Sequence, residues 1–551
     1  MSRSVPIRNR WTLVASTIAM AMVVAACGGG SGGSTSKADG DDAGTPVTGG
    51  TVTYGLEAET NGGWCLPEAQ LAIAGIQVAR AIYDTLTAPD EDAVAQPYLA
   101  KSVTPNADFT EWTIVLRDGV TFHDGSPLDA TVVKNNIDAW RGAYPARSPL
   151  LFAFVYKPIT AVEVVDPMTV KVTTDTSWPA FPSYLFNEGR SGIIAQAQLD
   201  DPSTCDRNLI GTGPFKLVDW KQGDRLTATK NPDYWQKDSN GTQLPYLDEI
   251  VFRPMTDATA RFNALLSGEL NAVHDSGADT LDLMEQDAEQ DEINLTATTD
   301  FADVAYELFN VSKAPFDNRD ARLAVIYAID RDTINEVGSM GLGKMASGPF
   351  APGEIGYLED TGYPSFDPQK SKEHLAAYEQ ASGQKLEFTL VGTLDPGTTR
   401  LLQLLQSQLK TAGIEANVRT VEQAALIDTA LGDDWNMLDW RNHPGGNPDA
   451  QYIWWKSGSP VNFNKFTDPE MDALLDAGRA EPDKKKSTGI YQDINKRFAT
   501  QGYNLWLQWV KWGVGTATDV HGVYGPDLPD GAKPFPGLAS GHPVLGLWVD
   551  Q

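Results

Sequence analysis

The spacing of hydrophobic positions alternates along the chain between the period of a strand and that of a helix. Residues 51–57 alternate and are rich in β-branched and aromatic side chains, which predicts a strand. Residues 69–86 carry apolar side chains three and four apart, which predicts a helix. Residues 398–412 repeat the helical spacing, and their core-facing stripe is formed by Leu401, Leu402, Leu405 and Leu409.

Similar patterns continue to the C-terminus. Alternation on both sides of a turn at 117–119 predicts a hairpin within residues 110–130, before a helix to Trp140 that Asp129 or Thr131 can cap. Further strands are predicted at 162–174, 215–220, 225–230, 250–255, 305–310 and 386–391, and further helices at 258–268 and 320–337. No fixed period recurs, so the pattern predicts an α/β protein with mixed sheets and no repeat array.

The N-terminus has the composition of a bacterial export signal. Arg3, Arg8 and Arg10 form a positive start without acidic residues, and residues 11–26 are apolar or small. This stretch is short for a membrane span. It ends in Val-Ala-Ala-Cys27, which resembles the lipobox of bacterial lipoproteins. We therefore expect removal of residues 1–26 and lipidation of Cys27; the alternative is an uncleaved anchor helix.

The rest of the chain agrees with an extracytoplasmic location. Residues 27–48 are mostly Gly, Ser, Thr and Asp, as in a flexible tether, and no later stretch has the length of a membrane span. We expect a protein anchored to the bacterial cell membrane only through the lipid on Cys27. After Cys27, only Cys65 and Cys205 remain, and an even pair in an oxidising compartment predicts a disulfide. Two buried thiols are the alternative.

Charge and composition exclude several classes of function. The 551 residues include 73 Asp and Glu against 43 Lys and Arg, a formal charge of −30, so a nucleic-acid partner is not expected. The six His residues are scattered, and no motif brings metal ligands or a catalytic group together, so we predict no metal, no cofactor and no enzyme activity. The 15 Trp residues exceed ordinary core needs and hint at a ligand surface.

Several segments, in a fixed order, resemble the extracytoplasmic solute-binding proteins of family 5, which serve peptide and nickel ABC importers. The segments are 83–86 (YDTL), 97–102 (PYLAKS), 112–127 (WTIVLRDGVTFHDGSP), 211–215 (GTGPF), 231–235 (NPDYW), 309–310 (FN), 314–317 (APFD) and 322–330 (RLAVIYAID). The resemblance extends along the chain from about residue 51 to beyond residue 449.

The resemblance implies a periplasmic-binding-protein-like fold of two hinged lobes with an additional inserted domain. Lobe 1 would be discontinuous and made of residues 49–89, 205–299 and 501–551. The inserted domain would be 90–204, and lobe 2 would be 300–500. A ligand would bind between the lobes, and the lobes would close on it.

The same resemblance nominates ligand-binding residues. Trp64 and Asn61 lie in a Gly-rich loop where the family often contacts ligand. Trp64 could form an aromatic wall, or could pack on the predicted disulfide. Tyr306 and Asn310 are further candidates at the end of a lobe 2 strand.

A second loop, 439–449, begins in peptide-binding relatives with a Trp and supplies an Asp for the peptide ammonium. Here Trp440, His443, Asn447 and Asp449 are the candidates, but the resemblance places the position of that Asp at His443 or Pro444. Arg441 adds a positive charge, and its fork suits a carboxylate or phosphate. The alternative is that Arg441 pairs with Asp439 or Asp449 as part of the structure.

These observations predict a monomeric binding protein that delivers a solute, most simply an oligopeptide, to an ABC permease with its ATPase subunits. Other ligands within this class stay open: a sugar oligomer, a modified peptide or an opine-like acid, with nickel disfavoured by the scattered His residues. Two other functions also stay open, a secreted hydrolase and a lipoprotein that uses the same fold as a sensor or chaperone.

Overall fold

A computed structural model describes residues 44–60, 63–64, 66, 68–69, 71–149, 152–203, 207–442, 446–540 and 542–550. Cys27, Cys65 and Cys205 lie outside the described residues, so lipidation and the disulfide stay predictions. In the described part, no helix is long and apolar enough to cross a membrane.

Lobe 1 is built on a seven-stranded sheet in the order β12-β19-β11-β1-β10-β9-β8. Its strands are β1 (Thr51–Leu56), β8 (Phe215–Lys221), β9 (Arg225–Lys230), β10 (Glu249–Pro254), β11 (Ala272–Asp275), β12 (Asn294–Thr298) and β19 (Trp512–Thr516). Its helices are α1 (Ile73–Ile82), α6 (Ala258–Leu266) and α7 (Ala278–Glu289), and a short sheet joins β20 (Val520–His521) to β21 (Trp548–Val549). The central strand β1 is parallel to both β10 and β11, and α6 connects those two neighbours.

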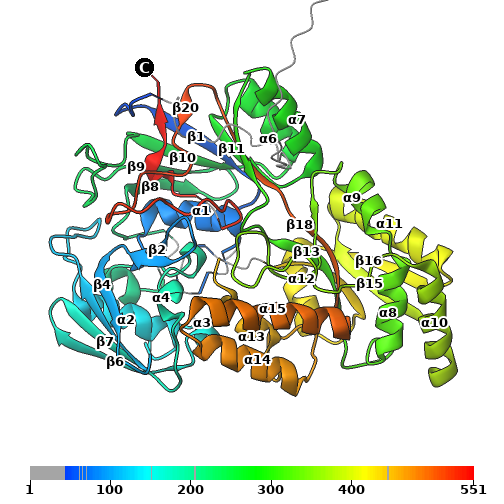
Figure 1. Cartoon of the computed structure of the whole chain (residues 1–551). Helices are drawn as coiled ribbons and strands as arrows, with labels where there is room; N and C mark the ends of the chain where they lie inside the picture. Colours follow the sequence, from blue (N-terminus) through cyan, green and yellow to red (C-terminus); the bar gives the residue numbers. More distant parts are fainter. Residues whose placement is uncertain are drawn as a thin grey trace, which may run out of the picture. The chain divides into compact units, whose positions relative to one another are not determined.

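Lobe 2 is built on a six-stranded sheet in the order β14-β18-β13-β17-β15-β16. Its strands are β13 (Val304–Phe309), β14 (Lys344–Met345), β15 (Glu387–Thr393), β16 (Glu415–Val421), β17 (Met437–Asn442) and β18 (Asn504–Trp509). Its helices are α8 (Arg319–Ala328), α9 (Arg331–Gly338), α10 (Pro368–Ser382), α11 (Pro396–Thr411), α12 (Gln423–Leu431), α13 (Tyr452–Trp455), α14 (Pro469–Ala480) and α15 (Lys484–Gln501). Figure 1 shows α8, α10 and α11 grouped together, apart from α13, α14 and α15.

The inserted domain contains a four-stranded sheet in the order β4-β5-β7-β6 and the small β2–β3 sheet. Its strands are β2 (Thr87–Pro89), β3 (Ala95–Pro97), β4 (Ala100–Pro105), β5 (Glu111–Leu116), β6 (Ile159–Asp166) and β7 (Thr169–Thr174). Its helices are α2 (Ala130–Trp140), α3 (Phe152–Val155), α4 (Phe181–Tyr184) and α5 (Gln196–Asp200). One hydrophobic cluster, which includes Trp112, Ile114, Val170 and Val172, fills this domain.

Most predicted elements are confirmed within a few residues, and three are corrected. The predicted hairpin at 110–130 is wrong, because β5 pairs with β4 and β7 and residues 122–126 form a tight turn. The predicted helix 320–337 is two helices, because α8 ends at Ala328 and Asp330 then caps α9 by accepting the Thr333 amide (3.2 Å). The helix expected at 69–86 spans only Ile73–Ile82. Asp129 does cap α2, through the Val132 amide.

Two chain segments cross between the lobes, one from β12 to β13 and one from β18 to β19. β18 pairs with β13 and β14, so it belongs to lobe 2 and not to the expected third part of lobe 1. Asp303 ties the crossings together: its carbonyl accepts the Val510 amide (2.9 Å), and its carboxylate accepts the Trp512 indole N–H (2.7 Å).

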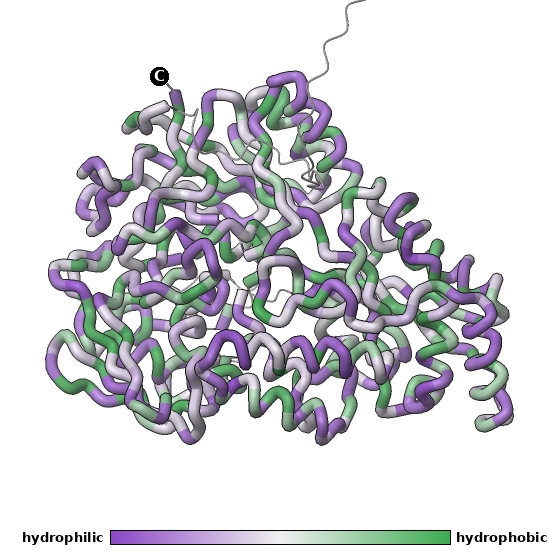
Figure 2. The backbone as a smooth tube through the Cα atoms, viewed as in Figure 1, coloured by the Kyte–Doolittle hydropathy of each residue, from purple (hydrophilic) through white to green (hydrophobic). Residues whose placement is uncertain are grey.

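The surface helices are strongly polar on one side. Figure 2 shows long hydrophilic stretches along α7 and α10, whereas their buried residues include Leu281, Met284, Leu375 and Tyr378. In α11, Leu402, Leu405 and Leu409 are fully buried and Leu401 is partly buried, which confirms the stripe read from the sequence.

Candidate functional site: the contact between the two lobes

Each lobe has a point where parallel neighbouring strands end side by side. In lobe 1 it lies at the carboxyl end of β1, between β10 and β11. In lobe 2 it lies at the carboxyl ends of β15 and β17, which are parallel neighbours linked through α11, β16 and α12. In open α/β sheets, ligands bind at such points, outside the carboxyl ends of the strands. The residues that follow these strands are therefore the candidates.

Arg441, near the end of β17, contacts lobe 1 directly. Its Nη1 donates to Ser276 Oγ (3.0 Å), in the turn between β11 and α7, and lies 3.8 Å from Asp303 Oδ2 on the hinge. Its side chain is 43% exposed, so the guanidinium still has free surface. The expected structural alternatives for Arg441 were Asp439 and Asp449. Instead, its ion-pair partner is Asp303, and Asp449 pairs with Arg479.

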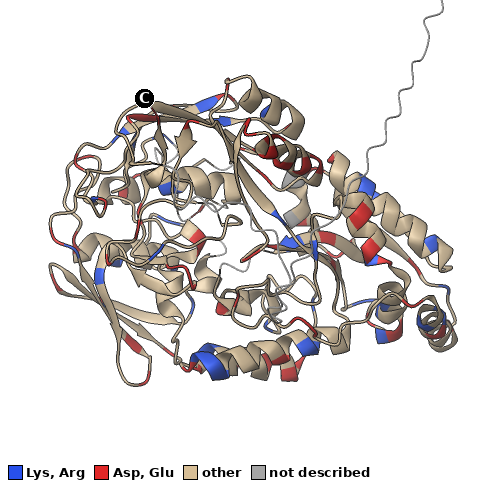
Figure 3. Ribbon diagram, turned by 45° about the horizontal axis from the view of Figure 1, so that its top comes forward, with Lys and Arg blue, Asp and Glu red and all other residues tan. Residues whose placement is uncertain are grey.

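Acidic residues surround this contact. Glu57 follows β1, and burial together with the nearby Asp275 raises the pKa of its carboxyl to about 7, although Arg261 and Arg441 oppose the rise. Arg261, itself buried, forms an ion pair with Asp275 at the end of β11. Figure 3 shows further acidic residues along α7, which begins beside Ser276. The lobe contact thus combines two guanidinium groups with several carboxylates.

A second acidic pair lies deeper in lobe 2. Glu307 on β13 is directly opposite Asp439 on β17, and both Glu307 carboxyl oxygens are buried without a hydrogen-bond partner in the described part of the chain. Burial raises the pKa of Glu307 well above its usual value, and the charge of Asp439 adds to the rise. Burial likewise raises the pKa of Asp439 to about 6. Both effects favour the protonated form of Glu307 over its carboxylate.

Trp64 is a core residue. It is 2% exposed, and its ring meets that of Trp220 edge-on, with 5.9 Å between ring centroids. Trp220 donates its indole N–H to Glu59 (2.8 Å), which also accepts the Gly223 amide (2.6 Å) and so anchors the loop after β1. The structure thus gives Trp64 an aromatic partner in lobe 1. Asn61 lies outside the described residues.

Trp440 and Arg441 lie on opposite faces of β17, as successive strand residues must. Trp440 is partly buried and meets Phe463 at 5.0 Å between ring centroids, and Trp454 meets the same ring at 5.6 Å. These three aromatic side chains belong to the same hydrophobic cluster as Leu426 of α12. His443 lies outside the described residues.

Tyr306 and Asn310 are not brought together with Arg441. Tyr306 is 4% exposed and packs on Trp506 with 4.7 Å between ring centroids. Asn310 is fully buried and accepts the hydroxyl hydrogen of Ser312 (2.7 Å). Because β13 is antiparallel to β17, Asn310 follows the end of β13 that pairs with Met437, the opposite end from Arg441.

Asn447 and Asp449 contact the inserted domain. Asn447 accepts the Asp449 amide (3.0 Å) and donates to Ser183 Oγ (3.1 Å). Asp449 is 2% exposed, and its carboxylate accepts hydrogen bonds from Trp178 and Tyr184 of the inserted domain and from Arg479 of lobe 2.

Sequence reasoning missed Glu57, Ser276 and Asp303. Glu57 directly follows β1, and Ser276 directly follows β11. Ligands in open α/β sheets bind outside the carboxyl ends of the strands, so both residues could have been nominated once the strand order was known. Asp303 carries no local signal, because its partners Trp512 and Arg441 are distant in sequence. Within the described ranges, no group of three or more His, Cys, Asp or Glu side chains is placed to hold a metal ion.

The comparisons with known proteins agree with this architecture. Residues 94–464 match the model of the bacterial extracellular solute-binding proteins, family 5 (middle). The glutathione-binding protein GsiB of Salmonella paratyphi A is 32% identical over 435 residues, which span 76% of this chain and 81% of that protein. The chain belongs to family 5 of the bacterial extracellular solute-binding proteins, and it is a substrate-binding protein of an ABC importer.

Solved structures show the same fold. The binding protein AgaA from A. tumefaciens R10, in complex with agropinic acid, aligns with a TM-score of 0.78 and 25% identity over 91% of this chain and 99% of that one. The oligopeptide-binding protein AppA from Bacillus subtilis, in complex with a nonapeptide, aligns with a TM-score of 0.75 and 21% identity over 92% of this chain and 100% of that one. Family 5 proteins bind solutes and are not enzymes.

Proposed function

We propose that this protein is a lipid-anchored receptor that captures a short peptide or peptide-like acid between its two lobes and presents it to an ABC permease. The ligand carries at least one carboxylate, which Arg441 binds, and an ammonium group, which the carboxylates around Glu57 attract. No covalent step is involved, and the ATPase subunits of the importer supply the energy of transport.

The position of Arg441 is the observation that carries this proposal. Its guanidinium lies at the carboxyl end of a lobe 2 strand, contacts Ser276 of lobe 1 and keeps 43% of its side-chain surface exposed. A planar guanidinium binds a carboxylate through two parallel hydrogen bonds, which is stronger and more directional than a single contact. The names of two similar proteins mention glutathione and agropinic acid, and both compounds bear carboxylates.

Ligand binding and lobe closure are coupled in this arrangement. A ligand held by Arg441 on one side and by the lobe 1 carboxylates on the other favours the state in which both sides are within reach. Binding shifts the equilibrium only by the difference in affinity between the open and closed states. The closed state is the form that the permease recognises.

The test begins with protein that lacks residues 1–27, purified gently, and mass spectrometry of what it releases on denaturation. Titration calorimetry with glutathione and with di- and tripeptides then compares the native chain with Arg441→Met. We expect the substitution to weaken binding by about 10- to 100-fold, the loss typical of a charged hydrogen bond.

Arg419→Met is the matched control, since Arg419 lies on β16 of the same sheet and its side chain is 40% exposed, but it pairs with Asp434 away from lobe 1. Equal binding by the native chain and Arg441→Met would refute the role of Arg441. Failure of all peptides and of glutathione to bind, with a different compound released on denaturation, would refute the proposed ligand class.

The lipid anchor has a separate test. Cells that express the full chain are grown with a radiolabelled fatty acid, and the labelled protein is compared with Cys27→Ser. The anchor predicts label and membrane association for the native chain, and neither for the variant. Label that persists in Cys27→Ser would refute lipidation at this residue.

A further inference from the structure

The helix α7 of lobe 1 is contacted by a second arginine of lobe 2. Arg441 donates to Ser276, which lies just before this helix. Arg400, on α11, donates from Nη2 to Asp279 Oδ2 on α7 (2.8 Å) and forms an ion pair with it. Both side chains of this pair are largely exposed, at 58% for Arg400 and 63% for Asp279. Two arginines of lobe 2 therefore meet the N-terminal end of the same lobe 1 helix.

An apolar contact joins the two lobes at the same helix. Leu342 lies in lobe 2, between α9 and β14, and packs against a hydrophobic cluster of lobe 1. That cluster includes Leu281 and Met284 of α7. We call the three contacts that lobe 2 makes here the latch: Arg441 with Ser276, Arg400 with Asp279, and Leu342 with the lobe 1 cluster.

The latch is separate from the chain segments that connect the lobes. The chain crosses between β12 and β13 and between β18 and β19, whereas α7, α11 and the segment from α9 to β14 lie outside these crossings. The latch contacts are thus made between elements that are held together only by the closed arrangement of the lobes. They consist of side chains of the protein itself, and they are lost when the lobes separate.

We infer that Arg400 and Asp279 are positioning residues, which hold the lobes closed before a ligand arrives and so set the affinity of the site without touching the ligand. Closure by the latch does not depend on the identity of the ligand, but its effect on affinity rests on the proposed function. When a ligand binds only the closed state, the apparent Kd is the intrinsic Kd divided by the closed fraction. A weaker latch therefore raises the apparent Kd.

The exposure of the ion pair determines the size of the effect. An exposed ion pair changes an equilibrium by about two- to fivefold, and added salt reduces the change. Reversing one of the two charges replaces the attraction by a repulsion. We expect Asp279→Arg or Arg400→Asp to lower the ratio of closed to open molecules by about fivefold. Affinity should fall by no more than the same factor, because it changes only through the closed fraction.

The experiment measures closure and affinity separately. Spin labels are attached at Ser267 of lobe 1 and Ser382 of lobe 2, both exposed, through a non-natural amino acid that spares the cysteines. Reversible unfolding first removes copurified solutes. Pulsed EPR then gives the distances between the labels, with and without glutathione, for the native chain, Asp279→Arg, Arg400→Asp and the double variant. We expect a closed population in the native chain without glutathione, its loss in each single variant, and its recovery in the double variant.

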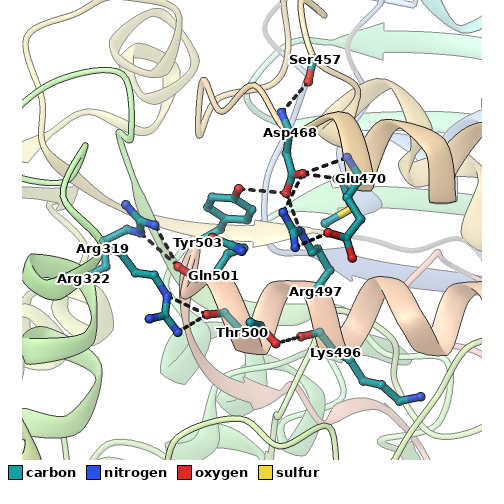
Figure 4. A network of polar contacts seen from close by, with 11 residues as sticks. Arg319, Arg322, Ser457, Asp468, Glu470, Lys496, Arg497, Thr500, Gln501 and Tyr503 are labelled. Carbon is teal, nitrogen blue, oxygen red and sulfur yellow. Dashed lines mark hydrogen bonds and ion pairs between the residues drawn. The ribbon is translucent and has the colours of Figure 1, made fainter.

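Glu470→Arg is the matched control. Like Asp279, Glu470 is the second residue of its helix, α14, and its side chain is 67% exposed. It pairs with Arg497 (2.6 Å) on α15 of the same lobe, as Figure 4 shows. The substitution changes the net charge by the same amount as Asp279→Arg. It should leave the label distances and the glutathione affinity unchanged, and urea denaturation checks that both variants stay folded.

The outcomes separate this inference from the proposed function. A native chain that is entirely open without glutathione overturns the latch, and so does a closed population that Asp279→Arg and Arg400→Asp leave unchanged. Failure of the double variant to recover closure, or equal opening by Glu470→Arg, also overturns it. If closure responds as expected but neither glutathione nor any peptide binds, the latch stands and the proposed function fails.

Discussion

Replacing Glu307 with Gln should make the protein more stable at neutral pH. Glu307 is fully buried, faces Asp439 across the β13–β17 pair and has no hydrogen-bond partner for either carboxyl oxygen in the described chain. Its pKa is well above the usual 4.5, chiefly because of burial. Gln resembles the protonated carboxyl of Glu in shape, but its amide does not ionise.

The expected size follows from proton linkage. Above pH 4.5, the unfolded chain releases this proton and the folded chain keeps it, so the free energy of unfolding falls by about 1.4 kcal/mol for each pH unit until the folded pKa is reached. Glu307→Gln removes this loss. The variant should therefore gain over the native chain as the pH rises above 4.5, by about 1.4 kcal/mol for each pH unit over which the folded chain keeps the proton, and this gain should vanish below pH 4.5.

The assay is urea denaturation of both chains at several pH values between 4 and 8. Glu415→Gln, an exposed substitution at the start of β16, is the control and should show a pH dependence parallel to that of the native chain. A Glu307→Gln curve that also runs parallel to the native one would refute the reasoning, because it would mean that Glu307 ionises alike in both states.

Four further substitutions test other parts of the structure. Leu405 lies in the fully buried stripe of α11, so Leu405→Ala should lower the free energy of unfolding by about 2–5 kcal/mol. Leu401 is only partly buried, so Leu401→Ala should lower it by less. Denaturant titration measures both losses, and equal losses would contradict the assignment of the buried stripe. Trp64→Ala should cost about 3–5 kcal/mol through lost packing on Trp220, and near-native stability would argue against its burial. Burial lowers the pKa of His274 and of His542 to about 3. The unfolded chain takes up these two protons from pH 6.5 downwards and the folded chain does not, so the stability of the protein should fall on acidification. His542→Gln should therefore reduce the fall in melting temperature between pH 7 and pH 5.

The sequence was most informative where the signal is local. The alternation of residues 51–57 gave β1, and the leucine spacing of 398–412 gave α11, because both depend on neighbours along the chain. The supposed hairpin around residue 119 failed for the opposite reason. The partners of β5 are β4 and β7, and β7 lies far away in the sequence, so alternation alone does not specify the pairing.

The same difference between local and long-range signals applies to the candidate site. Arg441 was found from its charge within a recognisable loop, but its contacts with Ser276 and Asp303 depend on how two lobes meet. From the sequence, Asp449 was expected to contact the ligand. In the structure it instead joins two domains, because its partners Trp178, Tyr184 and Arg479 come from two other segments of the chain. Glu307 looks like an ordinary strand residue until the register places Asp439 beside it.

The tie at Asp303 has a consequence for motion. A single strand crossing between two bodies acts as a swivel and permits rotation about several axes. Here two crossings are fastened side by side, by the Val510 amide on the Asp303 carbonyl and by the Trp512 indole on its carboxylate. Twisting one body against the other would shear these bonds, whereas bending both crossings together preserves them. Opening is thus reduced to one angular coordinate, which a single pair of spectroscopic labels across the lobes can follow.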